Sequence, residues 1–302
     1  IWRDVNANDG YFALGYGNLA VLYNEQHRFP EAEAYHKKAL ARLETNPDKN
    51  DPYLATILEN LGSLYRKAGR AADAELLLLR ANTIHENTVG PHHEDIARGL
   101  LNLAHVYVDQ GKMDDAKSLY DRSLNILVNR FGTDHDLVAE CFRGLGVIHV
   151  RYRKYDEARQ YFEKALTSYE KVMGVNHPQV ATTLNDLASN GLAEGNSAQA
   201  RDYLKRAMSI RAQILGSDHP DVAESHESYS RFYRLQKDAL SGLKAAASAH
   251  KIRGKVFEIV SAGMSESDAL TVSRLQQNAA NSFFSCYAEM PGATDTHVGS
   301  AS

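Results

Sequence analysis

The sequence predicts an all-α fold, a solenoid of antiparallel helix pairs, because three sets of residues recur at one spacing. The step is 42 residues, the distance from Leu19 to Leu61. One set is Leu19, Leu61, Leu103, Leu145, Leu187 and Tyr229. Two sets of mostly small residues keep the same step, Ala32, Ala74, Ala116, Ala158, Ala200 and Gly242, and Ala39, Ala81, Ser123, Ala165, Ala207 and Ala249. Six copies in one register, without an insertion, indicate a stack of helical repeats.

Each repeat contains two helical runs, most plainly in the fifth copy. Apolar residues fall at helical spacing within 180–188 and again within 200–210. Gly195 separates these runs. Gly216 and Pro220 mark the end of one copy and the start of the next, since glycine fits just past a helix end and proline fits a first turn. Each repeat is therefore expected to be an A helix followed by a B helix, with small residues where the helices approach closely.

Three segments of the fifth repeat resemble a known family. They are HPQVA at 177–181, NDLA at 185–188 and GSDHP at 216–220. Together they are similar to the long tetratricopeptide repeat of kinesin light chains and of many bacterial multidomain proteins, and the resemblance covers residues 10 to about 249. It implies a right-handed superhelical solenoid whose A helices line a concave groove. Because this repeat serves many unrelated systems, the resemblance is specific for fold and weak for function.

Composition limits the classes of function. The 302 residues are 43% hydrophobic and 24% charged, enough for an extensive strip-like core. The net charge of -4 argues against a general binder of nucleic acid or of anionic membranes. The two cysteines make no disulfide framework, and no apolar run is long enough to span a bilayer. A cytoplasmic protein is expected.

The ends of the sequence depart from the repeat. Residues 2–6 align in register with residues 86–90, the end of a B helix, and the sixth repeat has Lys237 and Asp238 where a glycine turn is expected. Terminal repeats are commonly atypical, because one face has no neighbour. The predicted organisation is the end of a preceding repeat at 1–9, six repeats at 10–262, a capping helix at 263–290, and a flexible linker or disordered tail at 291–302.

The last segment supports a second resemblance. Ser265-Glu266 and the run FFSCY at 283–287 are similar to the end of the repeat array in bacterial proteins whose array precedes a caspase-like CHAT protease domain. That resemblance implies a sensor or regulatory arm of a larger enzyme. The protease histidine and cysteine would lie beyond Ser302, so no catalytic residue is assigned within this sequence.

No catalytic or metal-binding pattern is found. Successive histidines recur one repeat apart, too far to converge on one metal ion, and we expect them to cap or pack the starts of A helices. These are His93, His135, His177 and His219. Cys141 and Cys286 are expected to be small packed thiols. There is no glycine-rich phosphate loop, nucleophile elbow or paired-carboxylate motif, which predicts a non-enzymatic protein without cofactor or metal.

The A helices are where a ligand is expected. We count positions from the repeated leucine. Outward-facing side chains are expected two residues before it and two, five and six residues after it, and one more position lies a turn earlier. The predicted binding residues are Arg66, Lys67, Arg98, His105, Arg143, Val147, Arg151, Asn185, Arg231 and Arg234.

Charge suggests the type of ligand. In repeats two to four, cations on this face outnumber carboxylates although the whole chain is acidic. This excess favours an acidic or carboxylate-bearing peptide, with arginines making bidentate contacts and Asn185 binding the peptide backbone. The alternative is that each arginine pairs with the glutamate of an adjacent repeat and the face is merely solvated. Apolar Val147 on the same face favours a groove.

Three hypotheses of function follow. The first is a non-catalytic scaffold that binds a peptide or partner segment in the groove. The second is the regulatory arm of a larger enzyme. The third, a helical repeat that binds nucleic acid, is disfavoured because the A helices lack the base-reading pairs and stacking aromatics of such modules.

Overall fold

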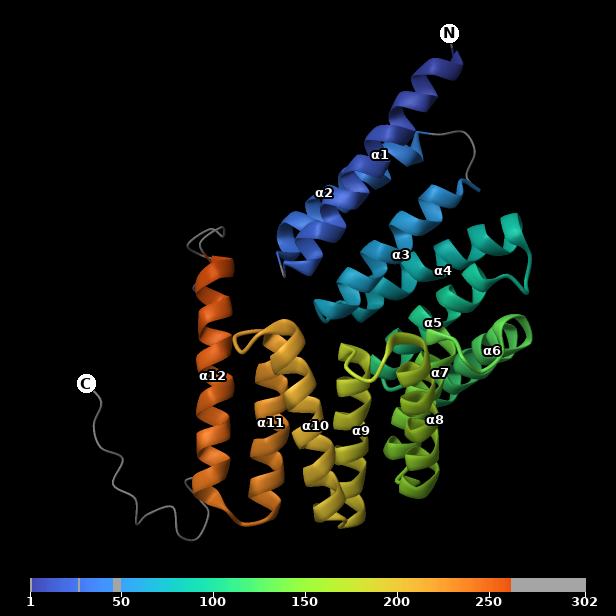
Figure 1. Ribbon diagram of the computed structural model, residues 1–302. Helices are drawn as coiled ribbons and strands as arrows, with labels where there is room; N and C mark the ends of the chain where they lie inside the picture. Colours follow the sequence, from blue (N-terminus) through green and yellow to red (C-terminus); the bar gives the residue numbers. More distant parts are fainter. Residues whose placement is uncertain (1, 27, 46–49, 262–302) are drawn as a thin grey trace. The chain divides into compact units, whose positions relative to one another are not determined.

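The computed structural model describes residues 2–26, 28–45 and 50–261, and in that part of the chain it contains twelve helices and no strand (Figure 1). The helices are α1 (Trp2–Glu25), α2 (Phe29–Glu44), α3 (Pro52–Lys67), α4 (Ala71–Val89), α5 (Glu94–Asp109), α6 (Met113–Phe131), α7 (Asp136–Arg151), α8 (Tyr155–Met173), α9 (Pro178–Glu194), α10 (Ser197–Leu215), α11 (Pro220–Leu235) and α12 (Ala239–Ser261). The predicted all-α fold class is confirmed.

Helix starts follow the predicted period. From α3 onward, the A helices begin at residues 52, 94, 136, 178 and 220, and the B helices from α2 begin at residues 29, 71, 113, 155, 197 and 239. Both series advance by 42 residues at every step. The sequence register therefore sets the register of the helices.

The chain forms two compact units, residues 1–152 and residues 153–302. The first contains α1 to α7 and the second α8 to α12. Within each unit, an A helix packs against the B helix that precedes it and against the B helix that follows it, wherever these belong to the same unit. It also packs against the neighbouring A helix of that unit. Within each unit, the A helices thus form a layer. We call the surface of this layer that B helices leave uncovered the inner face.

Small residues allow this packing. A side chain at Gly62 would place its Cβ 2.9 Å from Cγ of Leu78, and Ala74 beside it is fully buried. Leu61 and Leu64 complete the same core cluster with Ala32 of the preceding B helix. The predicted close approach of A and B helices is confirmed at this contact.

The first helix and the last residues bear on the predicted domain organisation. α1 runs without a break from Trp2 to Glu25 and begins eight residues before position 10, where the register expects an A helix. No helix end therefore separates residues 2–9 from the first A helix, and their assignment to a preceding repeat stays a prediction. The predicted capping helix at 263–290 and tail at 291–302 lie outside the described residues, as do Cys286 and the segments similar to CHAT proteins.

The loops between repeats use the predicted histidines as caps. The Nδ1 atoms of His93, His135, His177 and His219 each accept a hydrogen bond from the backbone N–H two residues later, at 3.2 to 3.3 Å. Asp51 does the same for α3 through a carboxylate oxygen. Glycines with positive φ, such as Gly174 at +87°, end the preceding B helices. The predicted capping role is confirmed.

This cap gives a testable expectation for stability. His177→Ala removes the acceptor for the N–H of Gln179, which lies 3.2 Å from Nδ1, and should lower the free energy of unfolding by about 1 kcal/mol. His177→Asn keeps a capping oxygen and should recover most of that loss. His92→Ala, in a sister loop at a histidine that caps no helix, is the control and should change stability by less than about 0.5 kcal/mol. Urea unfolding followed by circular dichroism measures all three.

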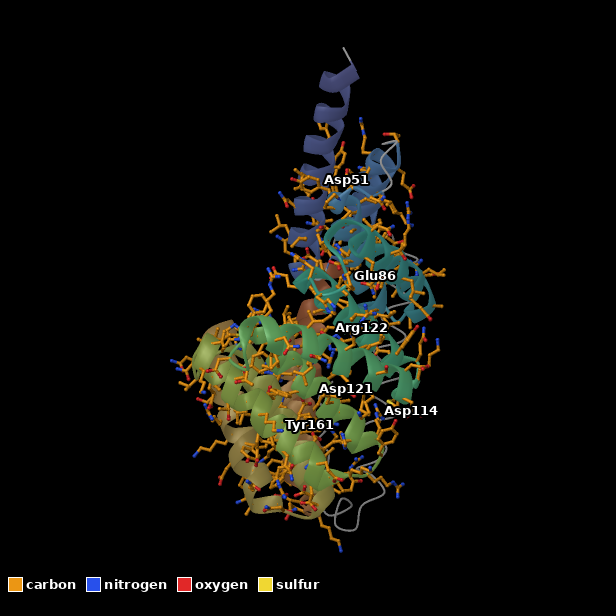
Figure 2. All side chains as sticks on the ribbon, turned by 90° about the vertical axis from the view of Figure 1, so that its right-hand side faces the viewer. Asp51, Glu86, Asp114, Asp121, Arg122 and Tyr161 are labelled. Carbon is orange, nitrogen blue, oxygen red and sulfur yellow. The ribbon has the colours of Figure 1, made fainter. Side chains whose placement is uncertain are left out.

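Ion pairs join consecutive B helices at one repeated position. Figure 2 shows one of them, where Arg122 on α6 lies beside Glu86 on α4. These side chains are partly exposed, so each pair adds only about 0 to 1 kcal/mol to stability. The three pairs are Arg80 with Glu44 at 2.7 Å, Arg122 with Glu86 at 3.2 Å and Arg206 with Glu170 at 2.5 Å.

Candidate interaction surface

The predicted binding residues all lie on A helices, divided between the two units. α3, α5 and α7 of the first unit hold Arg66, Lys67, Arg98, His105, Arg143, Val147 and Arg151. α9 and α11 of the second hold Asn185, Arg231 and Arg234. Each unit therefore has its own candidate surface.

Charges on the inner face of the first unit are largely paired. Arg66 Nη1 lies 3.2 Å from Asp109 Oδ2 on the next A helix. Arg98 contacts Asp95 on its own helix, and its Nε lies 3.7 Å from Glu59 Oε2 on the preceding A helix. Such contacts are expected if the arginines pair with acidic side chains of neighbouring repeats and the face is merely solvated. They neutralise much of the cationic excess that the sequence suggests for repeats two to four.

His105 lies between cations near the middle of this face. Burial lowers the pKa of its imidazole to about 3, and the guanidinium groups of Arg66 and Arg143 contribute. The carboxyl of Glu140 is 3.6 Å from Nε2 and would favour a charged ring, but burial raises the pKa of that carboxyl too. The ring packs edge-on against Tyr120 with 5.5 Å between ring centroids. His105 is therefore a neutral, packed side chain at neutral pH.

A neutral buried histidine makes stability depend on pH. Because the pKa of His105 is lowered on folding, the unfolded chain binds a proton below about pH 6.5 that the folded chain does not. Stability should therefore fall as pH drops from about 6.5 toward 3, by about 2 kcal/mol at pH 5 from this residue alone. Buried His36, whose pKa is lowered to about 4 by burial, acts in the same direction.

Chemical unfolding at pH 7 and pH 5 measures this dependence. His105→Gln should show a smaller loss between the two pH values than the unmodified chain, because glutamine does not titrate. An equal loss in both would mean that His105 does not contribute.

The other predicted residues of the first unit differ in exposure. Arg143 and Val147 are half-buried, whereas Lys67 and Arg151 are exposed. Arg151, in the last turn of α7, makes no ion pair within the described residues. Among the predicted arginines of this unit, Arg151 is the exposed one.

In the second unit, Asn185 of α9 is only 5% exposed, and neither its amide oxygen nor its amide nitrogen has a hydrogen-bond partner among the described residues. A buried amide without partners costs about 1 to 3 kcal/mol. Arg231 and Arg234 of α11 are both exposed and form no ion pair in the part of the chain that the structure describes. The second unit therefore has an unsatisfied, buried amide on α9 and two exposed guanidinium groups on α11.

The expected outward orientation is wrong for the position two residues before the repeated leucine. Glu59, Leu101 and Asn185 are all buried there. Successive A helices contact each other and cover these three side chains, whereas Arg143 at the same position is half-buried. Glu59 is held in place by His85, whose Nε2 lies 3.2 Å from its Oε1.

A buried arginine in the second unit was not identified from the sequence. Arg211 of α10 is 1% exposed. Its guanidinium donates to the backbone oxygen of Asp221 at 2.9 Å, to Ser225 Oγ at 3.0 Å and to Thr182 Oγ1 at 3.1 Å, and so joins α9, α10 and α11. The equivalent positions of the other repeats hold Leu43, His85, Leu127, Tyr169 and Arg253, so the register alone does not fix the character of this side chain.

The chemistry of Cys141 agrees with its predicted role as a packed thiol. Its side chain is fully buried on α7, and Sγ lies 3.4 Å from Oγ of Ser123. Burial raises the pKa of the thiol to about 12, so the reactive thiolate is not formed at neutral pH. Among the described residues, no three histidine, cysteine, aspartate or glutamate side chains are grouped so as to hold a metal ion.

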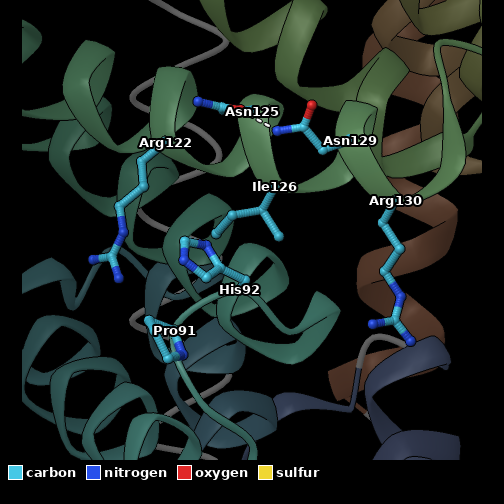
Figure 3. Close-up of a pocket in the computed structure, with 7 residues that line it drawn as sticks. All are labelled: Pro91, His92, Arg122, Asn125, Ile126, Asn129 and Arg130. Atoms are coloured by element: carbon cyan, nitrogen blue, oxygen red, sulfur yellow. Dashed lines mark hydrogen bonds between the residues drawn. The ribbon is translucent and has the colours of Figure 1, made fainter.

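A hollow on the B-helix side lies outside the predicted surface (Figure 3). It has a volume of about 530 Å³ and lies between α6 and the loop that joins α4 to α5. Its two guanidinium groups, of Arg122 and Arg130, are paired with Glu86 and Glu94 at 3.2 and 3.3 Å. Asn125 and Asn129 bond to each other. The charged groups of this hollow are therefore already paired with carboxylates of the same unit.

None of the helices within 2–26, 28–45 or 50–261 combines the length and apolar character needed to cross a bilayer. The period, the paired helices and the inner face define a helical-repeat protein. The tetratricopeptide repeat family matches residues 11–87, 95–171, 153–211 and 179–253. These matches cover most of the sequence, and the chain belongs to the tetratricopeptide repeat family.

Solved structures share this fold at low sequence identity. BtubC (BKLC) from P. vanneervenii is 22% identical with a TM-score of 0.58, over 76% of this chain and 91% of that one. A putative kinesin light chain with nearly identical repeats from Podosopora anserina is 20% identical with a TM-score of 0.54, over 68% and 96%. The Rap conjugation gene regulator of plasmid pLS20, solved with the Phr* peptide, is 16% identical with a TM-score of 0.60, over 85% and 76%. Among curated proteins, none matches this sequence.

Proposed function

We propose that this chain is a non-catalytic interaction scaffold that binds an acidic peptide or partner segment on the inner face of its second unit. The observation that carries the proposal is the combination on α9 and α11 of a buried, unpartnered amide with exposed arginines. Asn185 offers both a donor and an acceptor, as a peptide group requires. Arg231 and Arg234 offer guanidinium groups to carboxylates.

Family and structural likeness support this proposal. Tetratricopeptide arrays generally serve as interaction scaffolds, and the Rap regulator with the same fold was solved with a bound peptide. The second unit is favoured over the first because Arg66, Arg98 and His105 already contact carboxylates of their own unit. Arg151 remains a candidate for a separate contact on the first unit.

Asn185 requires a small movement to meet a ligand, because its amide is covered in the free chain. Hydrogen bonds to an incoming backbone would offset the cost of the unpartnered amide, and that gain favours the bound arrangement. Exposed Ser189, one turn further along α9, leaves room for a peptide beside it.

The first experiment is a peptide selection against the whole chain. Peptides displayed on phage should be enriched for runs of aspartate and glutamate, and their affinity should fall as salt rises, because exposed guanidinium groups are screened. Enrichment of basic or purely apolar peptides would contradict an acidic ligand. A selected acidic peptide then serves as the probe for the variants described in the Discussion.

A further inference from the structure

One position of the B helix faces one position of the A helix before it. In the second repeat, Nε2 of His85 on α4 lies 3.2 Å from Oε1 of Glu59 on α3. In the sixth repeat, the Nε–H of Arg253 on α12 donates to Oε1 of Glu227 on α11 at 2.8 Å. In both repeats, a side-chain nitrogen of the B helix therefore meets a carboxylate of the A helix.

The fifth repeat departs from this pairing. One step of 42 residues before Arg253 and Glu227, the same two positions hold Arg211 of α10 and Asn185 of α9. The arginine is kept, and an amide stands where the sixth repeat has a carboxylate. Both side chains are buried, with Arg211 1% and Asn185 5% exposed.

The guanidinium of Arg211 has one N–H group left without an acceptor. Nη1 donates to the backbone oxygen of Asp221 and to Ser225 Oγ. Nη2 donates to Thr182 Oγ1 and lies 3.4 Å from Oε2 of Glu224. These contacts account for the four Nη hydrogens of the five that a guanidinium carries. The fifth, on Nε, is buried and has no partner among the described residues.

The amide of Asn185 is a second unpartnered group at this place. Neither Nδ2 nor Oδ1 has a hydrogen-bond partner in the part of the chain that the structure describes. Thr182, which accepts from Arg211, lies one turn before Asn185 on the same side of α9, because residues three apart on a helix are neighbours. The fifth repeat thus has the arginine donor of the sixth and lacks its carboxylate.

We propose that Nε of Arg211 and Nδ2 of Asn185 form a binding site for one carboxylate of the acidic ligand. That carboxylate would accept from both N–H groups and take the place that Glu227 has against Arg253. This inference rests on the function proposed above and adds a specific contact to it. One aspartate or glutamate side chain of the ligand would enter between α9 and α11, and the exposed arginines of α11 would bind other carboxylates.

The energetics favour an anionic group here. A buried N–H donor that has lost water without gaining an acceptor is costly, most of all when it carries charge. A ligand carboxylate removes that cost through charge-assisted hydrogen bonds. Glu224 does not remove it, because its side chain is 49% exposed and lies against Nη2 of Arg211.

Asn185→Asp tests the site without a ligand. Aspartate has nearly the shape of asparagine and would place a carboxylate beside Arg211. We expect the urea midpoint of the full chain to rise at pH 7. The matched control is Ser189→Asp, which adds the same charge at an exposed position one turn further along α9 and should leave the midpoint unchanged. A midpoint that rises in neither Asn185→Asp nor the longer Asn185→Glu would overturn the proposal.

The same variants test the contact with a ligand. The probe is a fluorescein-labelled octaglutamate peptide, and fluorescence anisotropy gives its affinity for the full chain. Asn185→Asp should weaken binding at least about tenfold, because the carboxylate of the chain then fills the site. Ser189→Asp should weaken it no more than about threefold, since an exposed charge is screened. Equal weakening by both variants would mean that repulsion alone acts, and would overturn the proposal.

Failure of this site differs from failure of the function proposed above. Binding that Arg231→Glu with Arg234→Glu abolishes and Asn185→Asp leaves unchanged would keep the inner face of the second unit as the binding surface and overturn only the buried site. If neither octaglutamate nor a selected acidic peptide binds the unmodified chain, the proposed function is wrong and the site is wrong with it.

Discussion

Reversing the charge of Arg231 and Arg234 together is expected to weaken binding of a selected acidic peptide about a hundredfold or more. Each guanidinium is exposed on the inner face of α11 without an ion pair in the described residues, so its charge is available to a carboxylate. A hydrogen bond to a charged group contributes about 1.5 to 3 kcal/mol. Losing two such bonds therefore costs at least about 3 kcal/mol, and glutamates at these positions add repulsion.

The matched control changes net charge equally without touching the inner face. Lys205→Glu with Lys251→Glu alters exposed residues of the B helices α10 and α12 in the same unit. This variant should bind the peptide within about threefold of the unmodified chain, since distant exposed charges are screened. Isothermal titration calorimetry gives both affinities, and circular dichroism verifies that the thermal midpoint is unchanged.

A third variant decides which unit binds. Arg143→Glu with Arg151→Glu changes the inner face of the first unit, where sequence reasoning placed most of the excess charge. Binding that survives in this variant and is lost in Arg231→Glu, Arg234→Glu assigns the peptide to the second unit. The reverse result would move the site to the first unit and contradict the function proposed above.

Arg211→Ala is expected to be the most destabilising single substitution considered, lowering the free energy of unfolding by about 3 to 5 kcal/mol. Its guanidinium donates to groups on α9 and α11 from a position that is 1% exposed. Removing it leaves those acceptors without their donor and opens a cavity between three helices. Arg211→Met, which fills the space without the hydrogen bonds, should recover part of the loss.

Arg206 on the same helix is the control for Arg211. It also contacts another helix, through Glu170 at 2.5 Å, but its side chain is partly exposed, whereas Arg211 is 1% exposed. Arg206→Ala should therefore cost no more than about 1 kcal/mol. Similar losses from both variants, measured by urea unfolding, would show that burial of Arg211 does not determine its contribution.

The fold could be predicted because its determinants repeat. Small residues such as Gly62, helix-ending glycines such as Gly174 and the capping histidines act locally, and each recurs at one spacing. Local signals that agree with each other define a fold. They predicted the A and B helices and their 42-residue period, and the helices of the structure begin at that period.

The polar interior could not be predicted in the same way. Arg211 lies at a position that varies between repeats, from Leu43 and Leu127 to His85 and Tyr169, and Glu59 lies at a position counted as outward-facing. Whether such a side chain is buried depends on partners from other helices, here Ser225 for Arg211 and His85 for Glu59. Counting residue positions along one helix does not reveal partners that lie on other helices. The pair of Arg66 with Asp109 joins separate A helices, as the solvated-face alternative expects of the arginines on this face.

The arrangement in which each helix packs only against near neighbours in sequence has a consequence for how the chain folds. Contacts between residues close in the chain need little loop closure, so ordering of one helix pair does not wait for distant segments to meet. Folding can begin within any repeat and spread to the next. Local opening should likewise pass between neighbouring pairs, so the amide hydrogens of one helix pair should exchange together.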